Sequence, residues 1–256
     1  MPLLCDLIDL PAHALITIVG AGGKTTTMYT LASELAQRGK RVITTTTTQI
    51  FYPEPGETDT LIVAADTAIL LKKIDATWKQ HKRVTVTGVP IRIDKLGGLQ
   101  PEQPYELLIK SGADAVIVEA DGARHLMIKA PAEHEPVIPL QTSVAFLMMS
   151  AGAINRPLSA QVAHRPEHIA LVTGISQGDV LSPAVIAKLM TSEQGALKHI
   201  PKTAAAYLFI THASKSPTDA IHELASLVRR STRITGVLRS EQPGEWFTVV
   251  APQTGG

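Results

Sequence analysis

Apolar runs and helical patterns alternate along this chain, and the alternation predicts its secondary structure. Short runs rich in β-branched residues are typical of buried parallel strands. We expect such strands at residues 15–19, 41–44, 61–65, 84–89, 115–119, 144–149, 204–210, 233–238 and 246–250. Apolar side chains at helical spacing, with capping signals, predict helices at 24–39, 70–78, 104–111, 183–189 and 218–228.

This order of elements indicates an α/β fold. Helices that follow strands connect right-handed β-α-β units, which build parallel sheets. We expect a doubly wound, mostly parallel sheet with helices on both faces and an antiparallel carboxyl-terminal edge. The 256 residues predict a single domain over 1–256, in which the Pro-, Gly- and Gln-biased residues 251–256 form a flexible tail.

The first strand ends in a glycine cluster followed at once by Lys-Thr-Thr and a helical pattern. This order is that of a phosphate-binding loop (P-loop), where backbone N–H groups and the helix dipole attract phosphate. The chain has the short form G-x-x-G-K-T, because Ile18 stands at the first glycine of the full Walker pattern. The alternative is an ordinary glycine-rich turn. The predicted nucleotide-binding residues are Gly20, Ala21, Gly22, Gly23, Lys24, Thr25 and Thr26.

Acidic residues follow the apolar run at 115–118, as they do in a Walker B strand. A neighbouring parallel strand would bring Glu119 and Asp121 beside Thr25, on a magnesium ion or on the attacking water. We predict that Lys24, which can reach the β- and γ-phosphates, is catalytic together with Glu119 and Asp121. Thr25 and these two carboxylates are the predicted magnesium ligands, and the pattern does not decide which carboxylate meets the metal. The alternative is a strand with an acidic turn after it.

Asp121-Gly122 also resembles a switch turn, because glycine lets the backbone N–H swing toward a γ-phosphate.

A tract of threonines, 44–48, ends the second predicted strand. Threonine favours strands, so one interpretation is purely structural. The other is that this strand end faces the P-loop, because ligands bind at the carboxyl ends of parallel strands. Further side chains could contact the γ-phosphate or a second substrate at the same edge. The candidates for such contacts are Thr45, Thr46, Thr47, Arg124, Lys129, His164 and Arg165.

Two other segments carry expectations about exposure. Residues 129–136 include Glu133, His134 and Glu135, and we expect a solvated or substrate-facing loop there rather than a metal site. Gly97-Gly98 predicts a mobile turn.

Composition narrows the classes of partner. Hydrophobic residues make up 45% and charged residues 18% of the chain, which is typical of a globular protein. The formal net charge of +1 gives no basic surplus for nucleic acid or an anionic membrane, so we expect neither as a partner. Cys5 is the only cysteine, which excludes a disulfide within the chain. We expect a cytoplasmic protein.

The base of the nucleotide is less constrained than its phosphates. A guanine-specific P-loop protein usually has Asn-Lys-x-Asp after a late strand, where this chain has Thr211-His-Ala-Ser214. The sequence therefore favours ATP over GTP and leaves CTP open.

Several of these motifs together resemble the YqeC family of selenium-dependent molybdenum hydroxylase accessory proteins. The resemblance implies a P-loop nucleotide-binding protein that helps to mature these hydroxylases, with the client enzyme or its cofactor as a partner. The P-loop alone is also similar to that of the Mur ligase group, whose members form acyl phosphates with ATP. The segments that carry the YqeC resemblance are 19–27, the threonine tract, 118–122, 129–131 with 135–139, and 164–167.

Three functional hypotheses remain after this comparison of motifs. The first is a magnesium-dependent nucleoside triphosphatase that acts as a maturation factor. The second is an ATP-dependent kinase or ligase acting on a small molecule or on a selenium or molybdopterin species. The third is a nucleotide-gated chaperone or scaffold that binds nucleotide without turning it over.

Overall fold

The main sheet consists of the strands that the apolar runs predict. The computed structural model describes residues 2–242 and 244–250, so the tail expected at 251–256 lies outside the described residues. Each predicted strand is found within a few residues of its expected bounds. The strands are β1 (Ala14–Gly20), β2 (Val42–Thr46), β4 (Thr60–Val63), β5 (Arg83–Thr87), β8 (Ala115–Glu119), β10 (Val144–Ser150), β12 (Ala205–Thr211), β13 (Ile234–Ser240) and β14 (Trp246–Val250).

Within the described residues these strands form one nine-stranded sheet in the order β14-β13-β12-β10-β1-β8-β2-β5-β4. All neighbours are parallel except β13 and β14, which are antiparallel. The predicted mostly parallel sheet with an antiparallel carboxyl-terminal edge is therefore confirmed.

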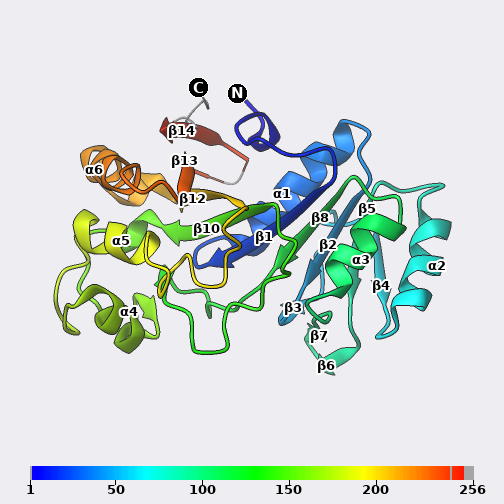
Figure 1. Ribbon diagram of the computed structural model, residues 1–256, viewed down its shortest axis with the longest axis horizontal. Coiled ribbons are helices and arrows are strands. Elements are labelled where there is room, and N and C mark those ends of the chain that lie inside the picture. The colour runs from blue at the N-terminus through cyan, green and yellow to red at the C-terminus, as the bar shows by residue number, and fades with distance from the viewer. Residues whose placement is uncertain (1, 243, 251–256) are drawn as a thin grey trace.

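Helices cover both faces of the sheet, which explains why its strands are apolar almost throughout. Alternate residues of β1 enter different clusters: Ile16 and Ile18 pack with α1, whereas Leu15 and Val19 pack on the opposite face with the other helices. In Figure 1, α4, α5 and α6 gather at one end of the sheet and α2 and α3 at the other. The helices are α1 (Lys24–Gln37), α2 (Thr67–Thr77), α3 (Gln103–Lys110), α4 (Pro166–Thr173), α5 (Pro183–Met190) and α6 (Thr218–Val228).

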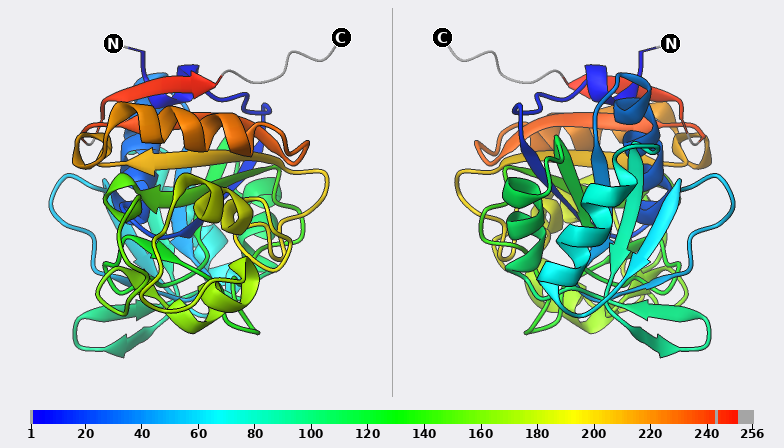
Figure 2. Two further views of the ribbon diagram at one scale, coloured as in Figure 1. Left: turned by 90° about the vertical axis from the view of Figure 1, so that its left-hand side faces the viewer. Right: turned by 90° about the vertical axis from the view of Figure 1, so that its right-hand side faces the viewer.

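The amino-terminal segment completes the α1 face. Leu4 and Ile8 join the cluster that contains Trp246 of β14, and Figure 2 shows this segment beside the last strands. The described residues also include three short 3-10 helices, at Leu4–Asp6, Ala151–Ala153 and Ala213–Lys215. No helix in the described part of the chain is long and apolar enough to cross a membrane.

Five short strands form two small sheets that the sequence pattern did not predict. They are β3 (Gln49–Phe51), β6 (Pro90–Arg92) and β7 (Lys95–Gly97) in one sheet, and β9 (Ile128–Lys129) and β11 (Ala163–His164) in the other.

The turn expected at Gly97-Gly98 is instead the end of β7, packed against the threonine tract. The Gly98 N–H donates to the Thr48 carbonyl at 2.8 Å. A Cβ on Gly98 would lie 2.4 Å from the Thr47 carbonyl carbon. Glycine is needed here for close approach of two backbones rather than for a mobile turn.

The strand order reverses at β1, which has β8 on one side and β10 on the other. In open parallel sheets, ligands bind at such a reversal, outside the carboxyl ends of the strands. The P-loop follows β1, so the fold places it at this point.

Candidate functional site

The glycine loop after β1 adopts a backbone that other residues would resist. Gly20, Gly22 and Gly23 have φ values of 99°, 78° and 91°, in the left-handed region that favours glycine. A Cβ on Gly20 would also lie 2.3 Å from the Met148 carbonyl oxygen on β10. The Thr211 hydroxyl, at the end of β12, donates to the Gly22 carbonyl at 2.9 Å and anchors the loop from the other side.

Lys24 begins α1 and turns its ammonium back into the loop. The side chain is buried, and Nζ donates to the Gly20 carbonyl at 2.8 Å. Nζ also lies 3.4 Å from Asp121 Oδ1 and 3.7 Å from Glu119 Oε1. Burial acts to lower the pKa of Lys24, but the carboxylates of Asp121 and Glu119 outweigh it and raise that pKa. Lys24 is therefore charged.

Thr25 and Glu119 meet directly, as the magnesium prediction requires. The Thr25 hydroxyl donates to Glu119 Oε2 at 2.7 Å. Burial raises the pKa of the Glu119 carboxyl, against the opposing effects of Lys24 and the Thr25 hydroxyl. Magnesium takes oxygen ligands and is commonly held by one or two side chains plus phosphate oxygens and water, so this hydroxyl–carboxylate pair fits it. No group of three or more His, Cys, Asp and Glu side chains able to hold a metal occurs within 2–242 and 244–250.

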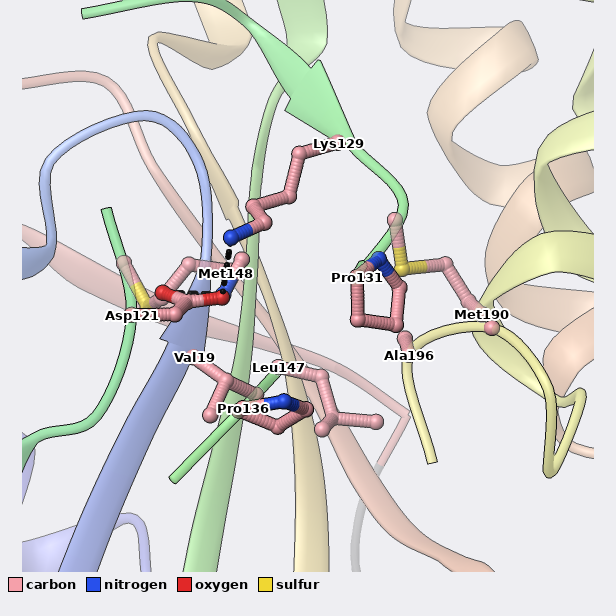
Figure 3. A pocket seen from close by; sticks show the side chains of 11 residues that line it. Val19, Asp121, Lys129, Pro131, Pro136, Leu147, Met148, Met190 and Ala196 are labelled. Atoms are coloured by element: carbon pink, nitrogen blue, oxygen red, sulfur yellow. Dashed lines mark hydrogen bonds and ion pairs between the residues drawn. The ribbon is translucent and has the colours of Figure 1, made fainter. Parts of the chain in front are cut away.

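Asp121 is held by three partners, the Gly20 N–H, Lys24 and Lys129. Its carboxylate accepts from the Gly20 N–H at 3.0 and 3.2 Å and faces Lys24. Its Oδ2 also lies 3.0 Å from the Lys129 ammonium, which Figure 3 shows pointing at Asp121. The two predicted carboxylates thus occupy different environments, with Glu119 beside Thr25 and Asp121 between two lysines.

The segment 129–136, expected to be a solvated or substrate-facing loop, begins in a buried ion pair. Lys129 is only 3% exposed, and its ammonium contacts the Gly122 carbonyl and Glu135 Oε2, each at 2.7 Å. The Arg165 guanidinium donates to both oxygens of Glu135 at 2.7 and 2.9 Å. The expectation of a solvated loop is wrong for Lys129, because the acidic turn after β8 supplies its buried partner, whereas Glu133 and His134 are exposed.

Two hydroxyls of the threonine tract donate hydrogen bonds to backbone carbonyls. The Thr46 hydroxyl donates to the Glu119 carbonyl at 2.7 Å, and the Thr47 hydroxyl donates to the Val137 carbonyl at 2.6 Å. The Thr45 hydroxyl is buried and has no hydrogen-bond partner among the described residues. The tract therefore fixes the strand end that carries Glu119.

The remaining candidates lie around the same edge without touching the P-loop residues above. Thr26 and Arg124 are exposed, and Arg124 has a φ of 50°. Burial lowers the pKa of His164, and the nearby charges of Arg165, Lys129 and Arg124 lower it further. Glu135 acts in the opposite direction and raises the pKa of His164.

Small hollows lie beside the glycine loop. One, of about 10 Å³, lies between Asp121, Lys129 and an apolar wall that includes Pro131 and Met190 (Figure 3), and it has room for about one water molecule. A larger hollow of about 440 Å³ is lined by Ala14 and other residues at the amino ends of the strands, away from this chemistry.

Another hollow beside the glycine loop, of about 50 Å³, was not predicted from the sequence. It is bounded by Gly23 and the first turns of α1 on one side and by the ends of β12 and β13 on the other. Trp246 is one of its lining residues, and the indole N–H of Trp246 is buried and meets no acceptor among the described residues. Burial, with Lys215 nearby, lowers the pKa of His212. The lining residues are Gly23, Thr26, Thr27, Thr30, Thr211, His212, Ser240, Gln242 and Trp246.

Comparison with known proteins gives a family match and several structural likenesses. The family model for the YqeC protein matches residues 16–167. The YqeC protein of Escherichia coli (strain K12) is 30% identical over 220 residues, which are 82% of this chain and 81% of that protein.

Three solved structures are similar over almost the whole chain at low sequence identity. FlhF complexed with GTP and Mg²⁺ has a TM-score of 0.44 and 14% identity, over 96% of this chain and 77% of that one. The signal recognition particle 54 kDa protein of Aeropyrum pernix K1, in complex with GDP, has a TM-score of 0.43 and 14% identity, over 95% and 45%. FtsY of Mycoplasma mycoides has a TM-score of 0.38 and 11% identity, over 94% and 66%. The chain thus spans less than half of the second protein and just under two thirds of the third.

Proposed function

The chain belongs to the YqeC family, and we propose that it binds a nucleoside triphosphate with magnesium and cleaves the terminal phosphoryl bond. One observation carries the proposal: Lys24 and Thr25 converge on the glycine loop with two carboxylates, Glu119 at the end of β8 and Asp121 just after it. These groups come from two neighbouring strands and one helix N-terminus. Their chemistry is that of phosphoryl transfer, where positioning and charge neutralisation dominate.

Binding uses the loop as an anion cradle. The Gly20 N–H donates to Asp121 and the Ala21 N–H to the Met148 carbonyl, so the N–H groups of Gly22, Gly23 and the first turn of α1 receive the β- and γ-phosphates. The Lys24 ammonium exchanges the Gly20 carbonyl for a phosphate oxygen, a stronger acceptor because it is charged.

Thr25 and Glu119 hold the magnesium ion in this proposal. When bound, magnesium supplies positive charge to the phosphate oxygens. Asp121 orients the attacking water, which adds to the γ-phosphorus while the bond to the β–γ bridging oxygen breaks, and the proton that the water loses passes to a phosphate oxygen. Inorganic phosphate and the nucleoside diphosphate leave.

The hollow bounded by Gly23 and the ends of β12 and β13 is the proposed nucleoside site, because it adjoins the loop. Its lining contains no carboxylate within the described part of the chain. Guanine presents a donor edge, its N1–H and 2-amino group, that a carboxylate accepts well, and adenine lacks this edge. This supports ATP as the nucleotide.

A second candidate is transfer of the phosphoryl group to another substrate. The observation that favours it is the exposed Arg124, two residues after Gly122, whose guanidinium adds positive charge near His164. Such a group suits an anionic acceptor. The motif resemblance supports a cytoplasmic role in maturing selenium-dependent molybdenum hydroxylases, with the client or its cofactor as acceptor or partner.

The test is phosphate release from ATP, GTP and CTP with magnesium, comparing the wild type with Lys24→Ala and with Lys72→Ala. Lys72 is an exposed lysine on α2 and serves as the matched control. Nucleotide binding is measured on the same samples with fluorescent analogues. We expect ATP turnover that is lost in Lys24→Ala and kept in Lys72→Ala.

Binding that depends on Lys24, without turnover, would replace hydrolysis by a gated scaffold or by an enzyme that needs its acceptor. Turnover stimulated by an added acceptor would favour the second candidate. Binding that survives in Lys24→Ala would refute the nucleotide site itself.

A further inference from the structure

A chain of ion pairs leads from the P-loop to α4, and hydrolysis as proposed above uses only its first member. The chain runs from Asp121 through Lys129 and Glu135 to Arg165. Its members come from the turn after β8, from β9, from the loop that follows, and from the residue before α4. Side chains far apart in sequence are therefore connected by direct contacts.

Lys129 is the centre of this chain. Its side chain is 1% exposed, and its ammonium lies within 3.0 Å of Asp121 Oδ2, the Gly122 carbonyl and Glu135 Oε2. It donates hydrogen bonds to the Gly122 carbonyl and to Glu135, and the contact with Asp121 is an ion pair. Any movement of Asp121 or Gly122 would take a partner from the buried Lys129 ammonium. A buried charged group is costly to leave without its partners.

Glu135 connects Lys129 to Arg165 in a fixed geometry. The two parallel hydrogen bonds from the guanidinium define both the distance and the orientation of the pair. Burial alone would raise the pKa of Glu135, but the bonds from Arg165 and Lys129 outweigh it and lower that pKa to about 2. The link is therefore ionised at neutral pH.

Arg165 is also the residue from which α4 starts. It is the N-cap of α4, with a left-handed backbone at φ 61°, a conformation that a non-glycine residue keeps only when its surroundings hold it. Its carbonyl accepts from the N–H groups of His168 and Ile169 at 3.1 and 3.3 Å. The parallel pairing of Lys129 with His164 ties the same two segments through their backbones.

We infer that Lys129 is a positioning residue that holds the Asp121-Gly122 turn and couples it, through Glu135 and Arg165, to the start of α4. Space is open beside Gly122, because no atom outside this residue and its two chain neighbours lies within 4 Å of the place a Gly122 Cβ would occupy. When Asp121 turns to orient the water beside the γ-phosphate, Lys129 loses one acceptor and the Gly122 carbonyl shifts. The pair Glu135–Arg165 carries that change to α4. This inference rests on the proposed function.

A fluorescent dye on α4 measures the coupling. Leu171 is 82% exposed on this helix, and Cys5 is the only cysteine, so Leu171→Cys in a Cys5→Ala background takes one dye. We expect the dye signal to change with magnesium and a non-hydrolysable ATP analogue, and not with magnesium and ADP.

The relay is broken by Glu135→Gln, which removes the charge but keeps the shape. The matched control is Lys198→Met, because Lys198 donates to the Ala132 and Glu133 carbonyls of the same loop but does not contact Asp121 or Gly122. In Glu135→Gln we expect nucleotide still to bind, the dye response to be lost, and the preference for triphosphate over diphosphate to fall by about fivefold or more. Lys198→Met should keep the response and the preference.

A double-mutant cycle separates coupling from general loosening of the loop. Arg165→Met should reproduce the loss seen in Glu135→Gln, and the double variant should lose no more than either single variant, since both break one path. Additive losses would overturn the inference, as would a full response in Glu135→Gln or an equal loss in Lys198→Met. If neither the wild type nor any variant binds fluorescent nucleotide, the proposed function is refuted instead. If the wild type binds nucleotide but the dye signal on α4 does not change, only the coupling is refuted.

Discussion

Replacing Lys24 by alanine should destabilise the nucleotide-free protein as well as abolish nucleotide binding. The ammonium lies 3.4 Å from Asp121 Oδ1 and 3.7 Å from Glu119 Oε1, and all three side chains are buried. At an effective dielectric constant of about 20, each contact is worth about 4 to 5 kcal/mol before desolvation. Burying the ammonium costs several kcal/mol, so we expect the free energy of unfolding to fall by about 3 kcal/mol.

The pH dependence of this loss identifies its cause. Burial already raises the pKa of Glu119, and loss of the Lys24 charge raises it further. A carboxyl whose pKa is higher in the folded state reduces stability only above its unfolded pKa, for which the reference value is 4.5. The deficit of Lys24→Ala should therefore be small below about pH 4.5 and grow as the pH rises through the folded pKa of Glu119.

Urea unfolding followed by circular dichroism, without nucleotide and over a series of pH values, measures the deficit. The double variant Lys24→Ala/Glu119→Gln should recover about half of the lost free energy near pH 7, because one unpaired carboxylate has been removed. A deficit that does not change with pH, or that Glu119→Gln fails to reduce, would refute the view that Lys24 is the counter-ion of these carboxylates.

Three further predictions test other contacts of the site. Gly20→Ala should lower the urea midpoint far more than Gly39→Ala, because both have positive φ but only the Gly20 Cβ clashes, at 2.3 Å; equal losses would contradict the loop geometry. Thr211→Val should weaken binding of a fluorescent nucleotide by about fivefold, the value of one lost hydrogen bond to the loop, and unchanged affinity would count against this anchor. The ionised Glu135 carboxylate stabilises the fold above its unfolded pKa of about 4.5, and this contribution is lost as the pH falls through its folded pKa of about 2. Glu135→Gln should therefore reduce the loss of stability between about pH 4.5 and 2, measured by circular dichroism.

Local sequence was enough to predict the main sheet and the glycine loop. Each long apolar run became a strand because a sheet covered on both faces needs continuous apolar residues. The glycines at 20, 22 and 23 also signalled their conformation locally, since each has positive φ.

Short elements were beyond this kind of prediction. The strands β9 and β11 are two residues long, too short for any periodicity to be visible.

The sequence by itself determined which chemical groups this protein has and which strand ends they follow. It could place Glu119 and Asp121 near Thr25, because parallel strands bring their carboxyl ends together. Only the tertiary structure decided how these groups are paired. Lys129 lies beside Asp121, and Thr211 reaches Gly22 across 189 positions of the chain. Such contacts depend on which strands are neighbours and on which buried charge needs a partner, and neither condition leaves a periodic signal along the chain.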